Sequence, residues 1–96
     1  MAIQVFADRD AELFFVEGRI GKRVPWRNLK KIVRRKLDML HYADALEDLK
    51  APPANRLEPL KGKWKGFYSI RINDQWRIVF RWTPRGPEEV RIIDYH

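Results

Sequence analysis

One stretch, residues 67–82 with the sequence FYSIRINDQWRIVFRW, constrains the fold most strongly, because apolar and basic residues alternate through two short runs. Alternation with a period of two is typical of β-strands that bury one face. The apolar face carries Tyr68, Ile70, Ile72, Trp76, Ile78, Phe80 and Trp82. The other face carries Arg71, Arg77 and Arg81. The pattern predicts a β-hairpin whose apolar face packs on helices and whose cationic face is the floor of an exposed groove.

The loop of this hairpin is constrained by the same pattern, because directly opposed residues of an antiparallel pair point to the same side. A two-residue loop at positions 73–74 would place Ile70 opposite Arg77 and mix the two faces. A three-residue loop at positions 73–75 places Ile70 opposite Ile78 and Tyr68 opposite Phe80. We therefore predict the longer loop.

The length of 96 residues predicts a single domain, residues 1–96, and a hydrophobic content of 45% is enough to fill one core. Lys and Arg number 20 against 13 Asp and Glu, so the net charge is +7 and the pI is about 10.1. This balance favours an acidic partner: a nucleic acid, an anionic lipid surface or an acidic protein. Charge alone does not choose among the three.

Several classes of protein are disfavoured by what the sequence lacks. No apolar run approaches the roughly 20 residues of a membrane span, and the first ten residues, MAIQVFADRD, lack the form of a signal peptide. We therefore expect a soluble, cytoplasmic protein with no membrane contact. The absence of cysteine and the presence of only 2 histidines argue against disulfides, thiol catalysis and a structural zinc site. We expect no metal and no cofactor.

The remaining segments predict helices and short strands around the hairpin. In the first half of the chain we expect a strand at residues 2–6, then a helix that Asp8 or Asp10 caps and that ends near Glu17, and then a helix from Pro25 and Trp26 to Tyr42. A helical turn at 43–49 and a strand at 56–60 follow. After the hairpin we expect a turn at 83–89 and a strand at 90–95. This order predicts an α+β fold with an N-terminal strand, in which two to three helices pack on one face of a small, mainly antiparallel sheet.

The second predicted helix has two distinct faces. Its apolar arc contains Trp26, Leu29, Ile32, Val33, Leu37 and Leu40. Its opposite arc contains Arg27, Lys30, Lys31, Arg34 and Arg35. The basic arc is either a solvated surface or a contact for RNA backbone. Lys36 is the one charge inside the apolar arc, and we expect its ammonium to reach water. We expect His41, at the helix end, to be solvated.

Residue types suited to cleaving RNA without a metal are concentrated on the sheet side. That reaction needs a base for the 2′-OH, cations for the charged phosphorane, and an acid for the leaving 5′ oxygen. The candidates are Glu58, Lys61, Arg71, Arg77, Asp94, Tyr95 and His96. Histidine titrates near neutral pH, and arginine offers a planar fork to two phosphate oxygens. By itself this set of residues is common in basic domains.

A family resemblance runs through the same residues. NRLEPLKG at 55–62, YSIRINDQWRIVFRW at 68–82 and the ending IIDYH, together with LEDLKAPP at 46–53, resemble the HigB-type toxins of the RelE/ParE superfamily. These proteins belong to bacterial toxin–antitoxin systems. The resemblance implies a compact RelE-like, microbial RNase-type fold and an endonuclease that cuts mRNA in the ribosomal A site. It also implies neutralisation by a helix-turn-helix antitoxin of the HigA type.

The resemblance carries functional roles onto particular residues of this chain. It places groove residues at Lys61, Arg77, Asp94, Tyr95 and His96. In this assignment Arg77 and Lys61 hold the scissile phosphate, His96 is the general acid, Tyr95 stacks on a base, and Asp94 or Glu58 assists the base step. Glu58 stands where some members have histidine, and Trp64 stands where a polar or basic residue is expected. Contacts to RNA or ribosome are expected from Trp64, Arg71, Arg81 and the basic arc.

Several alternatives stay open at this level. Asp94 either assists the base or orients a neighbour, and a regular strand would place Tyr95 on the face opposite to Asp94 and His96. Trp64 either stacks on RNA, docks on the antitoxin or folds back onto the core. Two other functions compete with the endonuclease: a non-catalytic DNA gyrase inhibitor like the ParE branch, and a basic nucleic-acid-binding module that uses the helix face.

Overall fold

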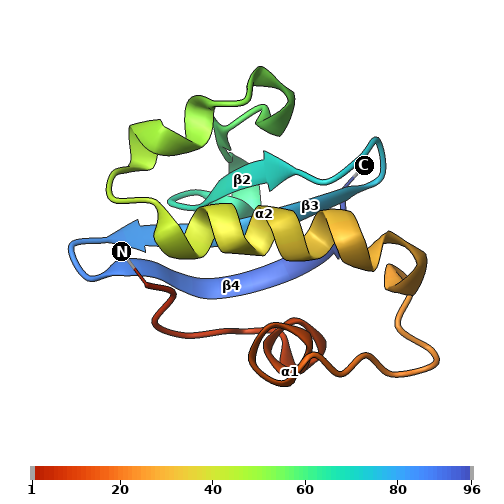
Figure 1. The fold of residues 1–96 in the computed structure, drawn as a ribbon. Coiled ribbons are helices and arrows are strands. Elements are labelled where there is room, and N and C mark those ends of the chain that lie inside the picture. The colour runs from red at the N-terminus through yellow and green to blue at the C-terminus, as the bar shows by residue number, and fades with distance from the viewer. Residues whose placement is uncertain (1, 96) are drawn as a thin grey trace.

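The computed structural model describes residues 2–95, and in them two α-helices pack against one four-stranded antiparallel sheet (Figure 1). The elements are α1 (Arg9–Glu17), η1 (Arg27–Leu29), α2 (Lys30–Tyr42), η2 (Leu46–Lys50), η3 (Pro53–Asn55), β1 (Glu58–Pro59), η4 (Gly62–Trp64), β2 (Tyr68–Arg71), β3 (Trp76–Thr83) and β4 (Gly86–Asp94). The strand order is β1-β2-β3-β4. In Figure 1, α2 runs across one face of the sheet and α1 lies beside β4. The predicted α+β class is confirmed.

The predicted hairpin and its register are confirmed. Tyr68 pairs with Phe80 and Ile70 pairs with Ile78 across β2 and β3. The Asn73 side-chain oxygen accepts hydrogen bonds from the backbone N–H groups of Gln75 and Trp76, at 2.9 and 2.8 Å. These bonds hold the loop closed, because an Asn side chain can take the place of a backbone acceptor in a turn.

The core lies between α2 and the sheet. Val33, Leu37 and Leu40 on α2 and Ile78 and Phe80 on β3 are fully buried. Burial of such side chains stabilises the fold by about 1.5–3 kcal/mol each. The apolar arc of α2 and the apolar face of the hairpin, both predicted from the sequence, therefore face each other across the core. Trp76 is also buried there, and Trp82 is partly buried against the same cluster.

Asp8 joins α1 to the sheet. One of its carboxylate oxygens accepts from the backbone N–H groups of Asp10 and Ala11, at 3.0 and 3.2 Å, and so caps the first turn of the helix. The other accepts from the backbone N–H of Ile92 in β4, at 3.0 Å. Gly18 ends α1 with a φ of 70°, in the left-handed region that favours glycine. Of the two predicted caps, Asp8 is the one used.

The predicted strand at residues 2–6 does not form as a strand. In its place the segment runs beside β4 and makes one isolated parallel bridge between Phe6 and Val90. The register of β3 and β4 shifts between Val79 and Arg81, and Glu89 has a φ of 52°. A β-bulge of this kind breaks the even spacing of backbone groups that a paired strand needs.

Other predicted boundaries also shift. The last strand begins at Gly86 rather than Val90, which shortens the predicted turn, and the strand expected at 56–60 contains only Glu58–Pro59. The first residues of the predicted second helix form η1, and the helical turn expected at 43–49 forms η2.

Neither α1 nor α2 has the length and apolar composition of a bilayer-spanning segment, and residues 2–95 contain no such helix.

The prediction for Lys36 is wrong. The residue is only 4% exposed, and its ammonium donates a hydrogen bond to the side-chain oxygen of Asn55, which is itself fully buried. The Asn55 amide in turn donates to the carbonyls of Leu49 and Ala51, at 3.2 and 3.3 Å. Because burial disfavours the charged form, and Arg35 and Arg71 add positive charge nearby, the pKa of Lys36 is lowered.

The prediction for His41 is also wrong. Its ring is half-buried with its centroid 5.1 Å from that of Phe15, and its Nδ1 accepts a hydrogen bond from the backbone N–H of Ile3 at 3.2 Å. His41 therefore anchors the N-terminal segment to the end of α2, and a role in the candidate site is not expected from this position.

Candidate active site

Arg77 is the centre of the candidate site, and residues from four segments of the chain surround its guanidinium. Its Nε donates to the Ser69 hydroxyl on β2 at 2.7 Å, and its Nη2 donates to the Arg56 carbonyl before β1 at 2.7 Å. The same Nη2 lies 3.6 Å from the Glu58 carboxylate, and the Cζ lies 5.5 Å from the ring centroid of Tyr95. With only 9% of the residue exposed, Arg77 is a pre-positioned cation.

The surroundings of Arg77 compensate its charge only in part. Burial lowers its pKa, the negative charge of Glu58 and the Tyr95 phenol raise it, and the cations of Arg71 and Arg56 lower it. The net direction is downward, chiefly because burial removes water from the guanidinium. Arginine nevertheless stays charged in proteins, so a bound anion such as a phosphate would supply part of the stabilisation that water gives an exposed arginine.

The register explains why these side chains meet. Arg71 pairs with Arg77 and Arg77 pairs with Ile93, while Glu58 pairs with Ser69. Directly opposed residues share a face, so the row that crosses the sheet at Arg77 points away from the apolar face that packs on α2. Alternation then places Tyr95 on the side of Ile93, which agrees with its contact to Arg77.

Asp94 lies on the other side of β4 from Tyr95 by the same reasoning, because it pairs with Trp76 on the apolar face. It is exposed, and its carboxylate accepts a hydrogen bond from the Gln75 side chain at 3.0 Å. The structure therefore ties Asp94 to the hairpin loop. His96 lies outside the described residues.

Lys61 is exposed and lies between β1 and η4. Two of the cations predicted to bind RNA are held by carboxylates: Arg71 forms an ion pair with Asp74, and the Nε of Arg81 lies 3.2 Å from Glu89. The Cζ of Arg81 also lies 5.0 Å from the centroid of the Phe67 ring. Of the predicted catalytic residues within 2–95, the structure brings together Arg77, Glu58 and Tyr95.

Sequence reasoning placed Ser69 on the face of Arg71 without giving it a role, and it named neither Phe67 nor Arg91 as contributors to this face. Alternation could have found both, because Phe67 lies two residues before Ser69, and Arg91 lies two residues before Ile93 in the predicted last strand. The Cζ of Arg91 lies 5.0 Å from the ring centroid of Trp64, which is half-buried and packs edge-to-face on Phe67. Trp64 thus folds onto the cationic face and not into the core.

The basic arc of α2 and η1 is organised differently. Arg27 donates to the carbonyls of Ile20 and Gly21, at 3.1 and 3.3 Å, and Arg34 donates to the carbonyl of Phe15 at 3.1 Å. These two arginines therefore attach the helix to the N-terminal segment. The other three members, Lys30, Lys31 and Arg35, are exposed.

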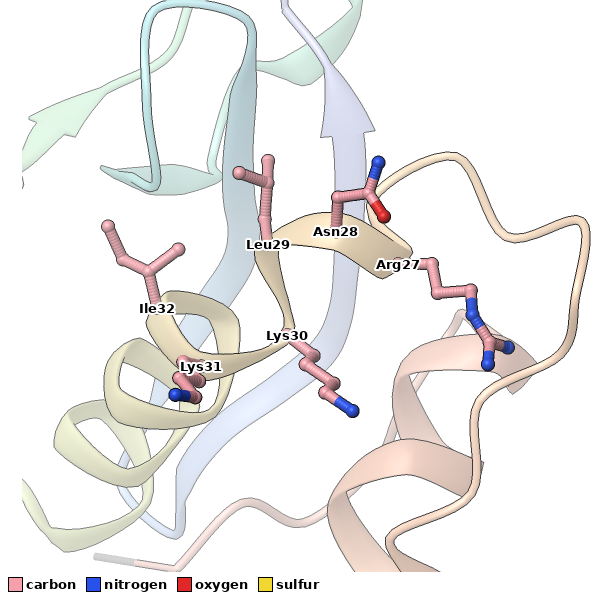
Figure 2. Close-up of a pocket in the computed structure, with 6 residues that line it drawn as sticks. All are labelled: Arg27, Asn28, Leu29, Lys30, Lys31 and Ile32. Carbon is pink, nitrogen blue, oxygen red and sulfur yellow. The ribbon is translucent and has the colours of Figure 1, made fainter.

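A shallow hollow of about 420 Å³ lies at the start of α2 and is lined by residues 27–32 alone. Figure 2 shows Leu29 and Ile32 pointing to one side of this segment, with the Lys30 and Arg27 side chains pointing away from them. The charged residues in its lining are all Lys or Arg, and the lining contains no carboxylate or histidine that could transfer a proton. Residues 2–95 also contain no group of three or more His, Cys, Asp or Glu side chains that could hold a metal ion.

Solved structures that share this fold include toxins of toxin–antitoxin systems. A YoeB–YefM complex from Staphylococcus aureus matches with a TM-score of 0.57 and 21% identity, over 100% of this chain and 97% of that one. A YoeB/ParE toxin from Agrobacterium tumefaciens matches with a TM-score of 0.54 and 23% identity, over 100% of both chains. The architecture is that of the RelE-like toxins.

Comparisons of sequence define the family within this class. The model of the HigB-like toxins, described as RelE-like toxins of the type II toxin–antitoxin system HigB, matches residues 4–96. Toxin HigB-1 of Vibrio cholerae is 39% identical over 83 residues, which are 86% of this chain and 85% of that protein. Endoribonuclease HigB of Proteus vulgaris is 29% identical over 94 residues, 98% of this chain and 99% of that protein. The chain belongs to the HigB-like toxin family, which confirms the resemblance noted in the sequence.

Proposed function

We propose that this protein is the toxin of a type II toxin–antitoxin system and an endoribonuclease that cuts mRNA on the ribosome, so that translation and growth stop. The observation that carries the proposal is the buried Arg77 guanidinium, fixed by Ser69 and the Arg56 carbonyl beside Glu58 and Tyr95. The name of the Proteus vulgaris relative, Endoribonuclease HigB, supports the reaction class.

In the proposed reaction the 2′-OH of the substrate attacks the adjacent phosphorus, the bond to the 5′ oxygen breaks, and a 2′,3′-cyclic phosphate forms. Arg77 and Lys61 stabilise the charge that develops on the phosphorane, where fixed cations are worth most. His96 donates a proton to the leaving 5′ oxygen. No metal ion takes part in this scheme.

The base step is assigned to Glu58. Its carboxylate lies 3.6 Å from Arg77 and its side chain is 46% exposed, so it can face both the phosphate and solvent. Asp94 is assigned a supporting role: it positions the end of β4 through its hydrogen bond to Gln75 and so helps to orient Tyr95. Tyr95 is the stacking partner of a base. The ribosome supplies the alignment of the mRNA, because effective positioning can replace much of the chemistry that strong acids and bases provide.

The proposed partners are a HigA-type helix-turn-helix antitoxin and the ribosome with mRNA in its A site. The Staphylococcus aureus neighbours are toxin–antitoxin complexes, which supports an antitoxin as a class of partner. The exposed cations Lys30, Lys31 and Arg35 are assigned to the phosphate backbone of ribosomal RNA, an attraction that does not depend on sequence.

The test is primer extension on a reporter mRNA in a purified translation system, with and without ribosomes. Arg77→Ala is the informative variant, and Arg85→Ala is the matched control, because the Arg85 side chain is 80% exposed in the turn before β4. We expect ribosome-dependent cuts from the wild type and from Arg85→Ala that Arg77→Ala loses. Intact mRNA with blocked supercoiling in a parallel gyrase assay would instead identify a gyrase inhibitor. Intact mRNA with active gyrase would favour a nucleic-acid-binding module.

A further inference from the structure

Lys36 is a buried charge that the proposed reaction does not use. It lies in the apolar arc of α2, and its ammonium donates a hydrogen bond to the side-chain oxygen of Asn55. Burial lowers the pKa of Lys36, and the positive charges of Arg35 and Arg71 lower it further. A buried ammonium is costly unless strong hydrogen bonds compensate it, so the bond to Asn55 is the contact that holds this charge in the fold.

Asn55 fixes the turn in which it lies. It is fully buried at the end of η3, and its side-chain amide donates to the carbonyls of Leu49 and Ala51 at 3.2 and 3.3 Å. Its backbone N–H donates to the Pro52 carbonyl at 2.9 Å. The turn is therefore attached to α2 through Lys36 and to the preceding segment through the Asn55 amide.

The residue after Asn55 presents its carbonyl to the candidate site. Arg56 has a φ of 45° and a ψ of 52°, in the left-handed region that residues other than glycine rarely adopt. Its backbone N–H donates to the Pro53 carbonyl at 3.0 Å, and its carbonyl accepts from the Nη2 of Arg77 at 2.7 Å. Such a conformation persists only where the surrounding structure holds it, and the bonds of Asn55 are the adjacent restraint.

Two hydrogen bonds from different parts of the fold set the orientation of the Arg77 guanidinium. The Ser69 hydroxyl, which accepts from Nε at 2.7 Å, belongs to the paired strand β2. The Arg56 carbonyl, which accepts from Nη2, belongs to the loop after η3. A planar group held at one nitrogen can still rotate about that bond, whereas two bonds at different nitrogens fix its plane. The loop therefore decides where the remaining N–H groups of Arg77 point, and these are the groups that a phosphate can meet.

We propose that Lys36 and Asn55 are positioning residues for the candidate active site, because their hydrogen bond holds the Arg56 carbonyl where it orients the Arg77 guanidinium. A pair of apolar side chains would fill the same space at no greater cost to stability, so stability alone does not require these two polar residues. The inference rests on the proposed endonuclease function and adds the buried residues that keep its central cation in place.

The first experiment compares four proteins that differ at the buried pair or far from it. They are the wild type, Lys36→Met, Asn55→Asp and Phe14→Leu. Asn55→Asp keeps an oxygen for Lys36 but loses the amide that donates to Leu49 and Ala51. Phe14→Leu is the control for a loosened core, because Phe14 is buried on α1. Figure 1 shows α1 and the loop that contains η2 and η3 on opposite sides of α2.

The measurement is the rate of cutting on ribosomes that carry a reporter mRNA, over a range of toxin concentrations, at a temperature where circular dichroism shows all four proteins folded. We expect Lys36→Met to lower the rate at saturating toxin about tenfold, because a small misplacement of a reacting group is costly in rate. Asn55→Asp should lower it by less, and Phe14→Leu should cut as the wild type does. The toxin concentration that gives half of the maximal rate should stay unchanged, since both residues of the pair are buried.

Wild-type cutting by folded Lys36→Met and Asn55→Asp would overturn the proposal. If neither variant folds, the pair serves the fold alone, and the positioning role is overturned as well. An equal loss of rate in Phe14→Leu would do the same, because a loosened core would then account for the effect.

A second readout does not depend on cleavage. In protein that carries isotope-labelled arginine, NMR follows the Nε–H signal of Arg77, which is assigned by its loss in Arg77→Lys. We expect this signal to shift in Lys36→Met and Asn55→Asp and to stay in place in Phe14→Leu. A signal that stays fixed in both folded variants of the pair overturns the proposal. A wild type that cuts nothing overturns the proposed function itself, and a shifted Arg77 signal would then still support the positioning of Arg77 by the pair.

Discussion

The two cationic surfaces of this protein, the face of the sheet around Arg77 and the outer face of α2, differ in how their charges are held. Arg77 is buried and bonded to Ser69 and to the Arg56 carbonyl, while Lys30 and Lys31 are exposed. Each of these cations adds the same unit charge to the net charge of +7, so composition alone does not rank the two surfaces. A fixed, partly desolvated cation can stabilise one particular charge, whereas mobile exposed cations attract any polyanion.

The largest effect is expected from Arg77. Replacing it with Ala should lower the rate of mRNA cutting by about 100-fold or more, because a fixed charge at a transition-state oxyanion is worth several kcal/mol. Arg77→Lys should recover little, since an ammonium cannot bond to Ser69, to the Arg56 carbonyl and to a phosphate in one plane. The measurement is the cutting rate on ribosomes at saturating enzyme, with circular dichroism to confirm that both variants fold. Equal rates for Arg77→Lys and the wild type would show that charge without geometry is sufficient.

Lys36 tests whether a cation is held in place by its burial or by the surface to which it belongs. It lies on α2, like Lys30 and Lys31, but it is buried like Arg77. Lys36→Met should lower the free energy of unfolding by about 1–3 kcal/mol, since it leaves the Asn55 side-chain oxygen without its donor. Urea unfolding at neutral pH measures this difference, with the exposed Lys65→Met as the control.

The same residue gives a pH dependence of known sign. The pKa of Lys36 in the folded protein is lowered below its ordinary value of 10.5, so on raising the pH the folded state loses this proton before the unfolded state does. The unfolded state then binds more protons, and stability contributed by Lys36 rises with pH up to about 10.5. The stability gap between the wild type and Lys36→Met should therefore widen as the pH approaches that value. A gap that stays constant or narrows would contradict the lowered pKa.

A smaller effect is expected from the exposed part of the α2 surface. The triple variant Lys30→Gln, Lys31→Gln, Arg35→Gln should weaken cutting on ribosomes several-fold, because it removes up to three phosphate contacts and leaves the site intact. Its affinity for ribosomes, measured by co-sedimentation, should also fall less steeply with salt than that of the wild type. If the triple variant lowered the cutting rate as much as Arg77→Ala does, the fixed cation and the exposed cations would be equally important for cutting, and the two surfaces would not differ in function.

The parts of the structure that sequence could predict are those that depend on periodicity. The hairpin register followed from the alternation of residues 68–80, and the core face of α2 followed from the spacing of Val33, Leu37 and Leu40. The cap at Asp8 followed from local chemistry. Each of these features is determined by neighbours along the chain or across one strand pair.

The parts that sequence could not predict depend on contacts between distant segments. Lys36 was expected in water because its partner, Asn55, is 19 positions away in the short turn η3, which no periodic pattern announces. The strand expected at residues 2–6 likewise depended on how this segment pairs with the distant β4, where Phe6 and Val90 form only an isolated bridge. For the candidate site, alternation placed Arg77 on the right face, but its bonds to Ser69 and Arg56 needed the three-dimensional structure.

The smallest effect is expected from Arg34, and it sharpens the comparison within α2 itself. This arginine lies in the basic arc, yet its guanidinium lies 5.0 Å from the centroid of the Phe15 ring and 3.4 Å from Asp38. Its side chain is 46% exposed, so these contacts should add less than about 1 kcal/mol of stability. Arg34→Gln should therefore lower the midpoint of thermal unfolding slightly and leave the salt dependence of ribosome binding unchanged. A reduced salt dependence, as expected for the triple variant, would make Arg34 a contact for RNA. Attachment to Phe15 would then not separate structural from binding arginines on this helix.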